Sequence, residues 1–188
     1  MKRSIHPQAV PGEPAAVRWV TDVDLPVGRV VSAPGTLGPL LEYGVLTKAF
    51  VERGGVWTWL APDHTWTEHG PRIRDAVSSA VDLPGWKVDE GSDELLGLIA
   101  REILDGELAG YVESHGGVIT VAAAEGGRLT LDFGGACEDC PAASSTLHER
   151  IEAAVRERYP LLGGVERVGG AHHRSGGWLG LPVPGRGR

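Results

Sequence analysis

The spacing of apolar residues over the first 55 positions predicts two strands followed by a helix. Apolar and polar residues alternate over 15–23, as in a half-buried strand, and a second short strand is predicted at 29–31. Over 38–53 the apolar residues recur at helical spacing, and Gly54-Gly55 supplies a stop signal. We therefore expect one helix over 38–53.

The pattern that follows predicts a hairpin and a second helix. Residues 56–60 and 65–67 are two short strand-like runs on either side of Pro62-Asp63. Pro71 is tolerated in a first helical turn, and a helix is predicted over 71–81. The unit therefore has the order β-β-α-β-β-α. Its tryptophans are expected to belong to the core, because aromatic side chains on a small sheet bury a large area.

The second half opens with a helix and a hairpin. An apolar stripe over 95–104 follows Ser92-Asp93, a favourable helix start. Two strands are predicted at 118–121 and 128–133, and they are joined by the turn residues Glu125-Gly126-Gly127. Two strands joined so closely should pair antiparallel.

A second helix and a returning strand complete this half. An amphipathic pattern predicts a helix over 142–159, and Pro160 ends it. Residues 164–168 can return as a strand beside the hairpin after a crossover over the sheet. The order is α-β-β-α-β, with a mixed three-stranded sheet. The fold class expected for the whole chain is α+β or α/β in two small domains.

Composition changes near Pro84-Gly85, and this change predicts a domain boundary. Residues 91–169 hold 14 acidic and 6 basic side chains, whereas five of the six tryptophans precede residue 87. We predict a first domain over 1–87, a linker over 88–92, a second domain over 93–169, and a flexible Gly/Arg tail over 170–188.

The same composition argues against several classes of protein. No run approaches the roughly 18 apolar residues of a membrane span. Prolines follow the charged start at once, without the apolar stretch of a secretory signal, so a reducing, cytoplasmic setting is expected. The formal net charge of −7 argues against a general binder of nucleic acid. We therefore expect neither nucleic acid nor a membrane as a partner.

The candidate chemistry lies in the only two cysteines, Cys137 and Cys140. A disulfide between them would close almost no loop, so they are interpreted as metal ligands or redox groups. They fall at a predicted strand-to-helix turn, where the positive end of a helix favours thiolates. A tetrahedral zinc ion or a cubane cluster takes four ligands, so the simplest completion is a second copy of the chain.

These residues resemble a known family. The stretch Gly135-Ala136-Cys137-Glu138-Asp139-Cys140-Pro141-Ala142-Ala143-Ser144-Ser145-Thr146-Leu147 is similar to the motif of the Nfu (NifU C-terminal-type) domain of iron–sulfur cluster assembly. Residues 1 to about 83 are similar, by pattern, to the N-terminal domain that accompanies Nfu. The resemblance implies a [4Fe–4S] cluster bridging a homodimer, with Cys137 and Cys140 as ligands. It also implies a carrier rather than an enzyme, which receives clusters from an upstream scaffold and delivers them to apo-proteins. A [2Fe–2S] form stays open.

Two departures from the family pattern affect the expected site. The chain has His115-Gly116-Gly117-Val118 where the family shows acidic residues around the two glycines, and His115 is expected to be a solvated turn residue. Glu138 and Asp139 place negative charge between the cysteines. Because a four-thiolate cluster is already anionic, these carboxylates should disfavour electron uptake and lower its reduction potential.

Three other functions compete with the cluster carrier. A Cys-x-x-Cys pair at a strand–helix turn also occurs in thiol–disulfide oxidoreductases, although few residues follow the last predicted helix here. A structural zinc ion could bridge two chains through the same four sulfurs. The third is an interaction module whose cysteine pair is incidental.

Overall fold

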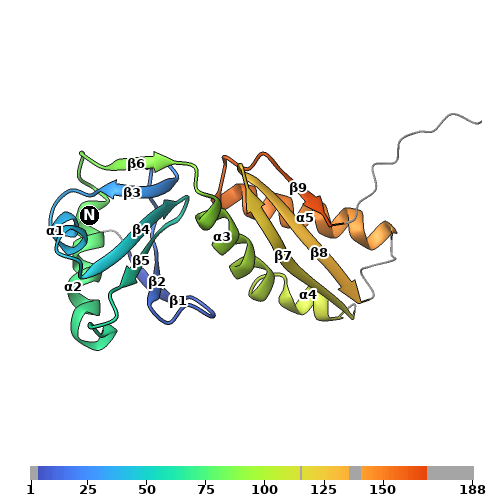
Figure 1. The fold of residues 1–188 in the computed structure, drawn as a ribbon, viewed down its shortest axis with the longest axis horizontal. Helices are drawn as coiled ribbons and strands as arrows, with labels where there is room; N and C mark the ends of the chain where they lie inside the picture. Colours follow the sequence, from blue (N-terminus) through green and yellow to red (C-terminus); the bar gives the residue numbers. More distant parts are fainter. Residues whose placement is uncertain (1–3, 115, 136–140, 169–188) are drawn as a thin grey trace, which may run out of the picture.

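The computed structural model describes residues 4–114, 116–135 and 141–168, with the backbone alone for residues 141–145. Figure 1 shows two halves side by side, each a sheet with its own helices. The fold class is α+β, as predicted. None of the helices in the described part is long and apolar enough to cross a membrane.

The N-terminal half is a six-stranded antiparallel sheet in the order β1-β2-β5-β4-β3-β6. Its strands are β1 (His6–Ala9), β2 (Ala16–Val20), β3 (Gly28–Ser32), β4 (Leu46–Glu52), β5 (Gly55–Leu60) and β6 (Lys87–Glu90). The helices α1 (Leu37–Glu42) and α2 (Trp66–Ala80) pack on one face of this sheet and share a buried cluster with it.

The predicted helix over 38–53 is wrong over most of its length. Helix α1 ends at Glu42, and residues 46–52 form the central strand β4, which pairs with β5 in a hairpin. The physical reason is burial on both faces. Ala49 and Val51 belong to the core beneath the helices, while Phe50 belongs to the core on the opposite face. A strand covered on both sides lacks the alternation that identifies strands.

The predicted strand at 65–67 is also wrong, and its residues begin helix α2. The side chain of Thr65 accepts a hydrogen bond from the backbone N–H of Glu68 at 3.3 Å. Thr65 is therefore the N-cap, and Pro71 lies inside the helix rather than in its first turn. Residues 87–90, expected to belong mostly to a linker, form the edge strand β6 beside β3.

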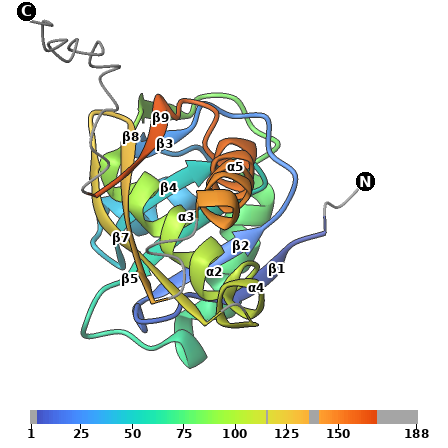
Figure 2. The same ribbon diagram turned by 90° about the vertical axis from the view of Figure 1, so that its right-hand side faces the viewer.

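The C-terminal half follows the predicted order closely. It contains α3 (Asp93–Asp105), α4 (Ala109–Ser114), β7 (Gly117–Glu125), β8 (Arg128–Gly135), α5 (Pro141–Arg158) and β9 (Gly164–Arg167). Strand β8 pairs antiparallel with β7 and parallel with β9, which confirms the mixed three-stranded sheet. Figure 2 shows α3 and α5 on the same side of β7 and β8. Helix α4 is an additional element.

The start of α3 and the β7–β8 turn stabilise each other. The hydroxyl of Ser92 caps the helix by accepting from the N–H of Leu95 at 3.2 Å. The carboxylate of Asp93 accepts from the N–H groups of Gly126 and Gly127 at 2.9 and 2.8 Å. Both glycines have positive φ, as the tight hairpin turn requires. The glycine pair is a local signal, and it explains why the sequence alone predicted the hairpin correctly.

The two halves share one buried cluster rather than meeting through a bare linker. Apolar residues of α3, α5 and the small sheet pack in the same cluster as Phe50, Trp57 and Trp59 of the large sheet. Helix α3 is buried on nearly all sides, as expected for a helix between two layers. The large sheet therefore has helices α1 and α2 on one face and the C-terminal half on the other. The domain limits 1–87 and 93–169 stay a prediction.

Candidate functional site

Both candidate ligands, Cys137 and Cys140, lie outside the described residues, and so do Glu138, Asp139 and His115. The structure does describe the elements on either side of the cysteines. Strand β8 ends at Gly135, and helix α5 begins at Pro141. The predicted strand and helix around the motif are therefore both present.

The end of β8 requires a glycine. Gly135 pairs with Gly117 of β7 and has a φ of +63°. A Cβ atom on Gly135 would lie 2.6 Å from the carbonyl oxygen of Gly116, which is closer than real Cβ contacts. Gly135 thus lets the backbones of β7 and β8 approach closely where the strand leaves the sheet. For Gly135, a residue of the motif, the structure thus supplies the physical reason for a glycine.

The N-terminal end of α5 brings a partial positive charge to this end of the domain. The helix has 18 residues, and its N-terminal end follows Cys140 directly in the chain. Unpaired N–H groups and the helix dipole make such an end favourable for anions, including thiolates and an anionic iron–sulfur cluster. The N–H groups of this helix end therefore fit an anionic cluster that is bound by two thiolates of this chain.

A groove lies beside the first residues of β7, at the same end of the domain. It has a volume of about 230 Å³ and lies between α4 and β7. Val118 in its wall is 59% exposed, while Val112 and Ile119 are buried. Asp105 and Glu113 add negative charge to its rim. The surroundings of the motif therefore combine exposed apolar area with carboxylates.

Two cation–π contacts link neighbouring elements at this end, one between two helices and one between two strands. The guanidinium of Arg150 on α5 lies 4.7 Å from the ring centre of Tyr111 on α4. The guanidinium of Arg167 on β9 lies 5.1 Å from the ring of Phe133 on β8. Such cation–π contacts are each worth about 0.5–1 kcal/mol at exposed sites. They help to hold α4 against α5, and β9 against the strand β8 that leads into the motif.

The described residues do not supply the two further ligands that a four-ligand metal site would need besides the two cysteines. Among residues 4–114, 116–135 and 141–168, no group of three or more His, Cys, Asp or Glu side chains could hold a metal ion. The rings of His64 and His69 lie 4.4 Å apart, but in the N-terminal half and as a pair alone. His172 and His173 fall outside the described residues.

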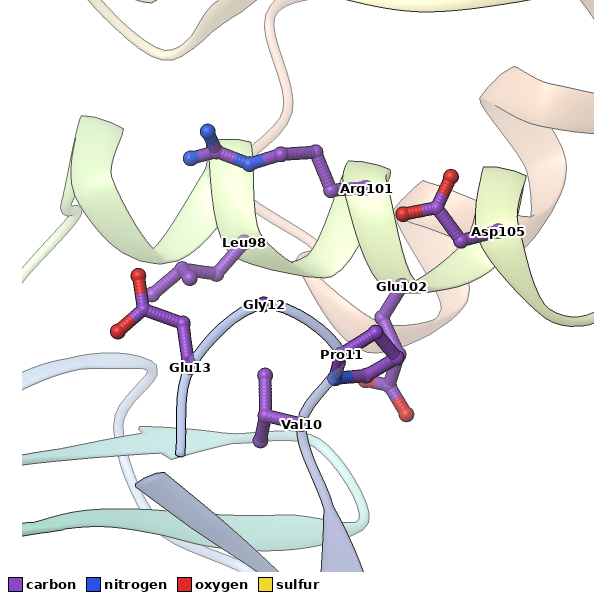
Figure 3. A pocket seen from close by; sticks show the side chains of 8 residues that line it. All are labelled: Val10, Pro11, Gly12, Glu13, Leu98, Arg101, Glu102 and Asp105. Atoms are coloured by element: carbon purple, nitrogen blue, oxygen red, sulfur yellow. The ribbon is translucent and has the colours of Figure 1, made fainter. Parts of the chain in front are cut away.

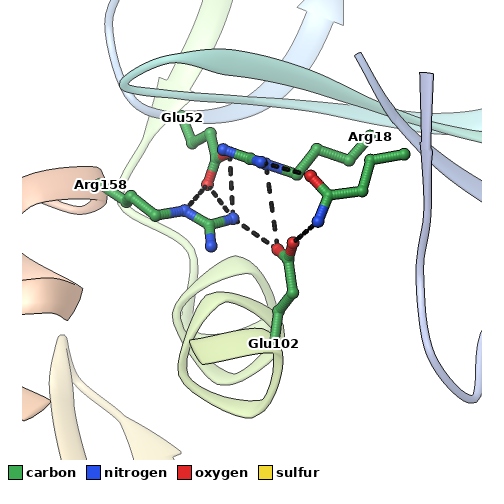
Figure 4. A network of polar contacts seen from close by, with 5 residues as sticks. Arg18, Glu52, Glu102 and Arg158 are labelled. Carbon is green, nitrogen blue, oxygen red and sulfur yellow. Dashed lines mark hydrogen bonds and ion pairs between the residues drawn. The ribbon is translucent and has the colours of Figure 1, made fainter. Parts of the chain in front are cut away.

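The junction between the halves holds polar residues that the sequence did not single out. Figure 3 shows a pocket between the β1–β2 turn and α3, with Glu13 on one side and Arg101, Glu102 and Asp105 on the other. Next to it, Glu52 is buried among charged side chains of both halves (Figure 4). The sole local signal is a glutamate at the end of the apolar run Phe50-Val51.

Comparison with known proteins adds a family to this description. Residues 101–167 match the family described as NifU-like domain. A protein named Fe/S biogenesis protein NfuA from Stutzerimonas stutzeri is 30% identical over 135 residues, covering 71% of this chain and 59% of that protein. The NfuA of Sodalis glossinidius is 34% identical over 98 residues, covering 50% and 51%. That of Ectopseudomonas mendocina is 42% identical over 66 residues, covering 35% and 34%. The matches thus span less than two thirds of each relative, and they confirm the resemblance drawn from the sequence.

Proposed function

We propose that this chain, whose residues 101–167 match the NifU-like domain family, is an Nfu-type carrier that takes iron–sulfur clusters from a donor scaffold to apo-proteins. Cys137 and Cys140 are the ligands, and two chains share one [4Fe–4S] cluster. The protein then needs no site of turnover, because the cluster is cargo rather than a catalyst. We place it in the cytoplasm.

The observation that supports this proposal is the pair of described elements that flank the two cysteines in the chain, β8 before them and α5 after them. The strand ends on a glycine that no other residue could replace without moving the backbone, and the helix offers its anion-binding end. With two sulfurs per chain, a four-sulfur site forms only when two copies meet. The names of the similar proteins support an iron–sulfur role for such a site.

Delivery proceeds by exchange of ligands. A thiolate of the acceptor displaces one cysteine of the carrier, and repeated exchange moves the cluster without oxidation or reduction. Each displaced cysteine leaves as a thiolate, which the helix end stabilises. Because the attacking group is a thiolate, the transfer rate rises with pH until the acceptor's thiols are ionised.

Anaerobic reconstitution of the full chain with ferrous iron and sulfide tests the proposal. We expect about two irons per chain, one cubane for each pair of chains, together with a doubling of the mass in solution. Cys137→Ala and Cys140→Ala should each abolish both. His64→Ala serves as the control, because it removes a possible metal ligand outside the motif and should keep the iron.

Three outcomes would contradict the proposal. Wild-type protein that stays monomeric and free of iron would refute the proposed carrier function. One zinc ion per dimer in a colourless protein would indicate a structural metal instead. A monomeric, redox-active dithiol would indicate a thiol–disulfide oxidoreductase.

A further inference from the structure

We propose that Glu52 and Arg158 are positioning residues for the cluster-binding segment. Through this pair the N-terminal half holds the C-terminal end of α5, whose first residue directly follows Cys140. The N-terminal half therefore acts as a fixed support for the ligand-bearing helix, within the same chain. This inference rests on the proposed function, and it identifies how the N-terminal half contributes to it.

Glu52 is a carboxylate without access to water. It is 0% exposed and ends strand β4. Its oxygens accept from the Nε atom of Arg18 on β2 and from the Nε and Nη2 atoms of Arg158, the latter two at 2.9 and 3.1 Å. A buried carboxylate is tolerated only when its oxygens are satisfied in this way. One of its two arginines comes from the other half of the chain.

Arg158 is held by more than its contact with Glu52. Its Nη2 atom donates to Glu102 of α3 at 2.6 Å, and its side chain is 16% exposed. Its carbonyl oxygen accepts from the N–H of Arg53 at 3.0 Å. Figure 4 shows Arg158 reaching from the end of α5 toward Glu52, between the large sheet and α3. The helix end is therefore bound to both halves at once.

The neighbouring residue adds a further anchor. The hydroxyl of Tyr159 accepts from the N–H of Ser92 at 2.8 Å, and its ring is 1% exposed. Gln8 of β1 completes the network by donating to Glu102 and accepting from Arg18, both at 2.8 Å. The end of α5 is thus held by a continuous set of polar contacts, which are buried around Glu52 and exposed at Gln8.

The opposite end of the same helix lies next to the cysteine pair. An 18-residue helix is about 27 Å long and behaves as a stiff rod. Leu147, Ile151 and Val155 bury its inner face in the cluster shared by the two halves. Because the rod is fixed at Arg158, motion at its first turn is restricted too. Release of this anchor should loosen the segment that carries Cys140.

This arrangement differs from a recruitment role for the N-terminal half. A half that recruits acceptors would change how tightly the acceptor binds. A half that positions α5 would instead change the rate of cluster release once the acceptor is bound. The two roles therefore separate in the dependence of the transfer rate on acceptor concentration.

The first test uses the full chain without a cluster. In Arg158→Gln, Glu52 keeps its partner Arg18, so the N-terminal sheet retains a paired carboxylate. We expect the backbone amides in the second and third turns of α5, which are hydrogen-bonded within the helix, to exchange hydrogen about tenfold faster. This factor corresponds to the loss of roughly one charge-assisted hydrogen bond. The matched control is Glu152→Gln, which removes the carboxylate charge that lies 2.6 Å from Arg156 and 3.7 Å from His148, both within α5.

Arg158→Lys keeps the charge but loses the two-nitrogen contact, so its exchange rate should lie between those of wild type and Arg158→Gln. Unchanged exchange in Arg158→Gln, or equal acceleration in Glu152→Gln, would overturn the positioning role. This hydrogen-exchange test needs no iron, so it decides on the positioning role even when reconstitution fails.

The second test follows transfer from reconstituted protein to an apo-ferredoxin of the [4Fe–4S] class. For Arg158→Gln we expect the limiting rate to rise about threefold or more, with an unchanged half-saturating acceptor concentration. The visible circular dichroism of the bound cluster should also change, because it reports the geometry of the ligands. A higher half-saturating concentration with an unchanged limiting rate would refute positioning in favour of acceptor recruitment. Wild-type protein that takes up no iron would refute the proposed function instead.

Discussion

The two ends of the C-terminal half are built in different ways. The end that faces the N-terminal half holds the nearly buried Tyr159 and meets Trp57 and Glu52 of the large sheet, which are both fully buried. The other end contains glycines with positive φ, the exposed Val118 and the open groove beside β7. Stability is thus concentrated at one end, and the candidate chemistry lies at the other. We therefore expect a substitution in the apolar cluster of the docked end to lower stability alone, and one beside the motif to lower both stability and iron content.

The largest expected effect concerns the docked end. Trp57 is fully buried, and its ring stacks on Trp59 with centroids 6.0 Å apart. Trp57→Ala should lower the free energy of unfolding by about 3–5 kcal/mol, because it leaves a cavity in the shared cluster. Urea denaturation measures this change. Tyr43→Ala removes an aromatic side chain that is 82% exposed, and it should change stability by less than about 0.5 kcal/mol. Similar losses in both variants would show that the docked end is not the stabilising one.

A smaller effect is expected at the opposite end. Gly135→Ala forces a Cβ atom against the carbonyl oxygen of Gly116 and places alanine at positive φ. We expect a loss of about 2–3 kcal/mol in stability and a lower iron content after reconstitution. Gly126→Ala is the matched control, because Gly126 also has positive φ but has no atom within 4 Å of the added Cβ. It should cost about 1 kcal/mol and keep the iron. Equal effects of the two substitutions would contradict a close approach at Gly135.

The smallest expected effect depends on pH. Burial raises the pKa of Tyr159 above 10.0, the hydrogen bond from Ser92 opposes this shift, and the charge of Asp93 adds to it. A folded-state pKa above the unfolded value means that this contribution to stability is fully present below about pH 10 and is lost as pH rises through the folded pKa. Tyr159→Phe should cost about 1 kcal/mol at neutral pH, the value of one hydrogen bond. Its stability should also fall less steeply than that of wild type above pH 10. If the stabilities of wild type and Tyr159→Phe fell in parallel above pH 10, the raised pKa of Tyr159 would be contradicted.

The elements that the sequence predicted correctly are those with strong local signals. The cap at Ser92, the turn at Gly126-Gly127 and the amphipathic pattern of α5 act over a few residues each. They fixed the order of the second half, and with it the place of the cysteine pair. The cap at Thr65 was equally local, since Glu68 follows at the third position, yet Thr65-Trp66-Thr67 also resembles a strand. The geometry of Cys137 and Cys140 themselves lies outside the described residues.

By itself, the sequence determined the donor chemistry of the two thiols and the strand-to-helix order around them, because spacing, caps and turns are local properties. The tertiary structure alone decided that residues 46–52 form a strand, since burial on both faces removes the alternation that would reveal it. It also decided that Glu52 meets Arg158, 106 positions further along the chain. A contact at such separation leaves no period in the sequence, because it depends on how two sheets pack around one helix.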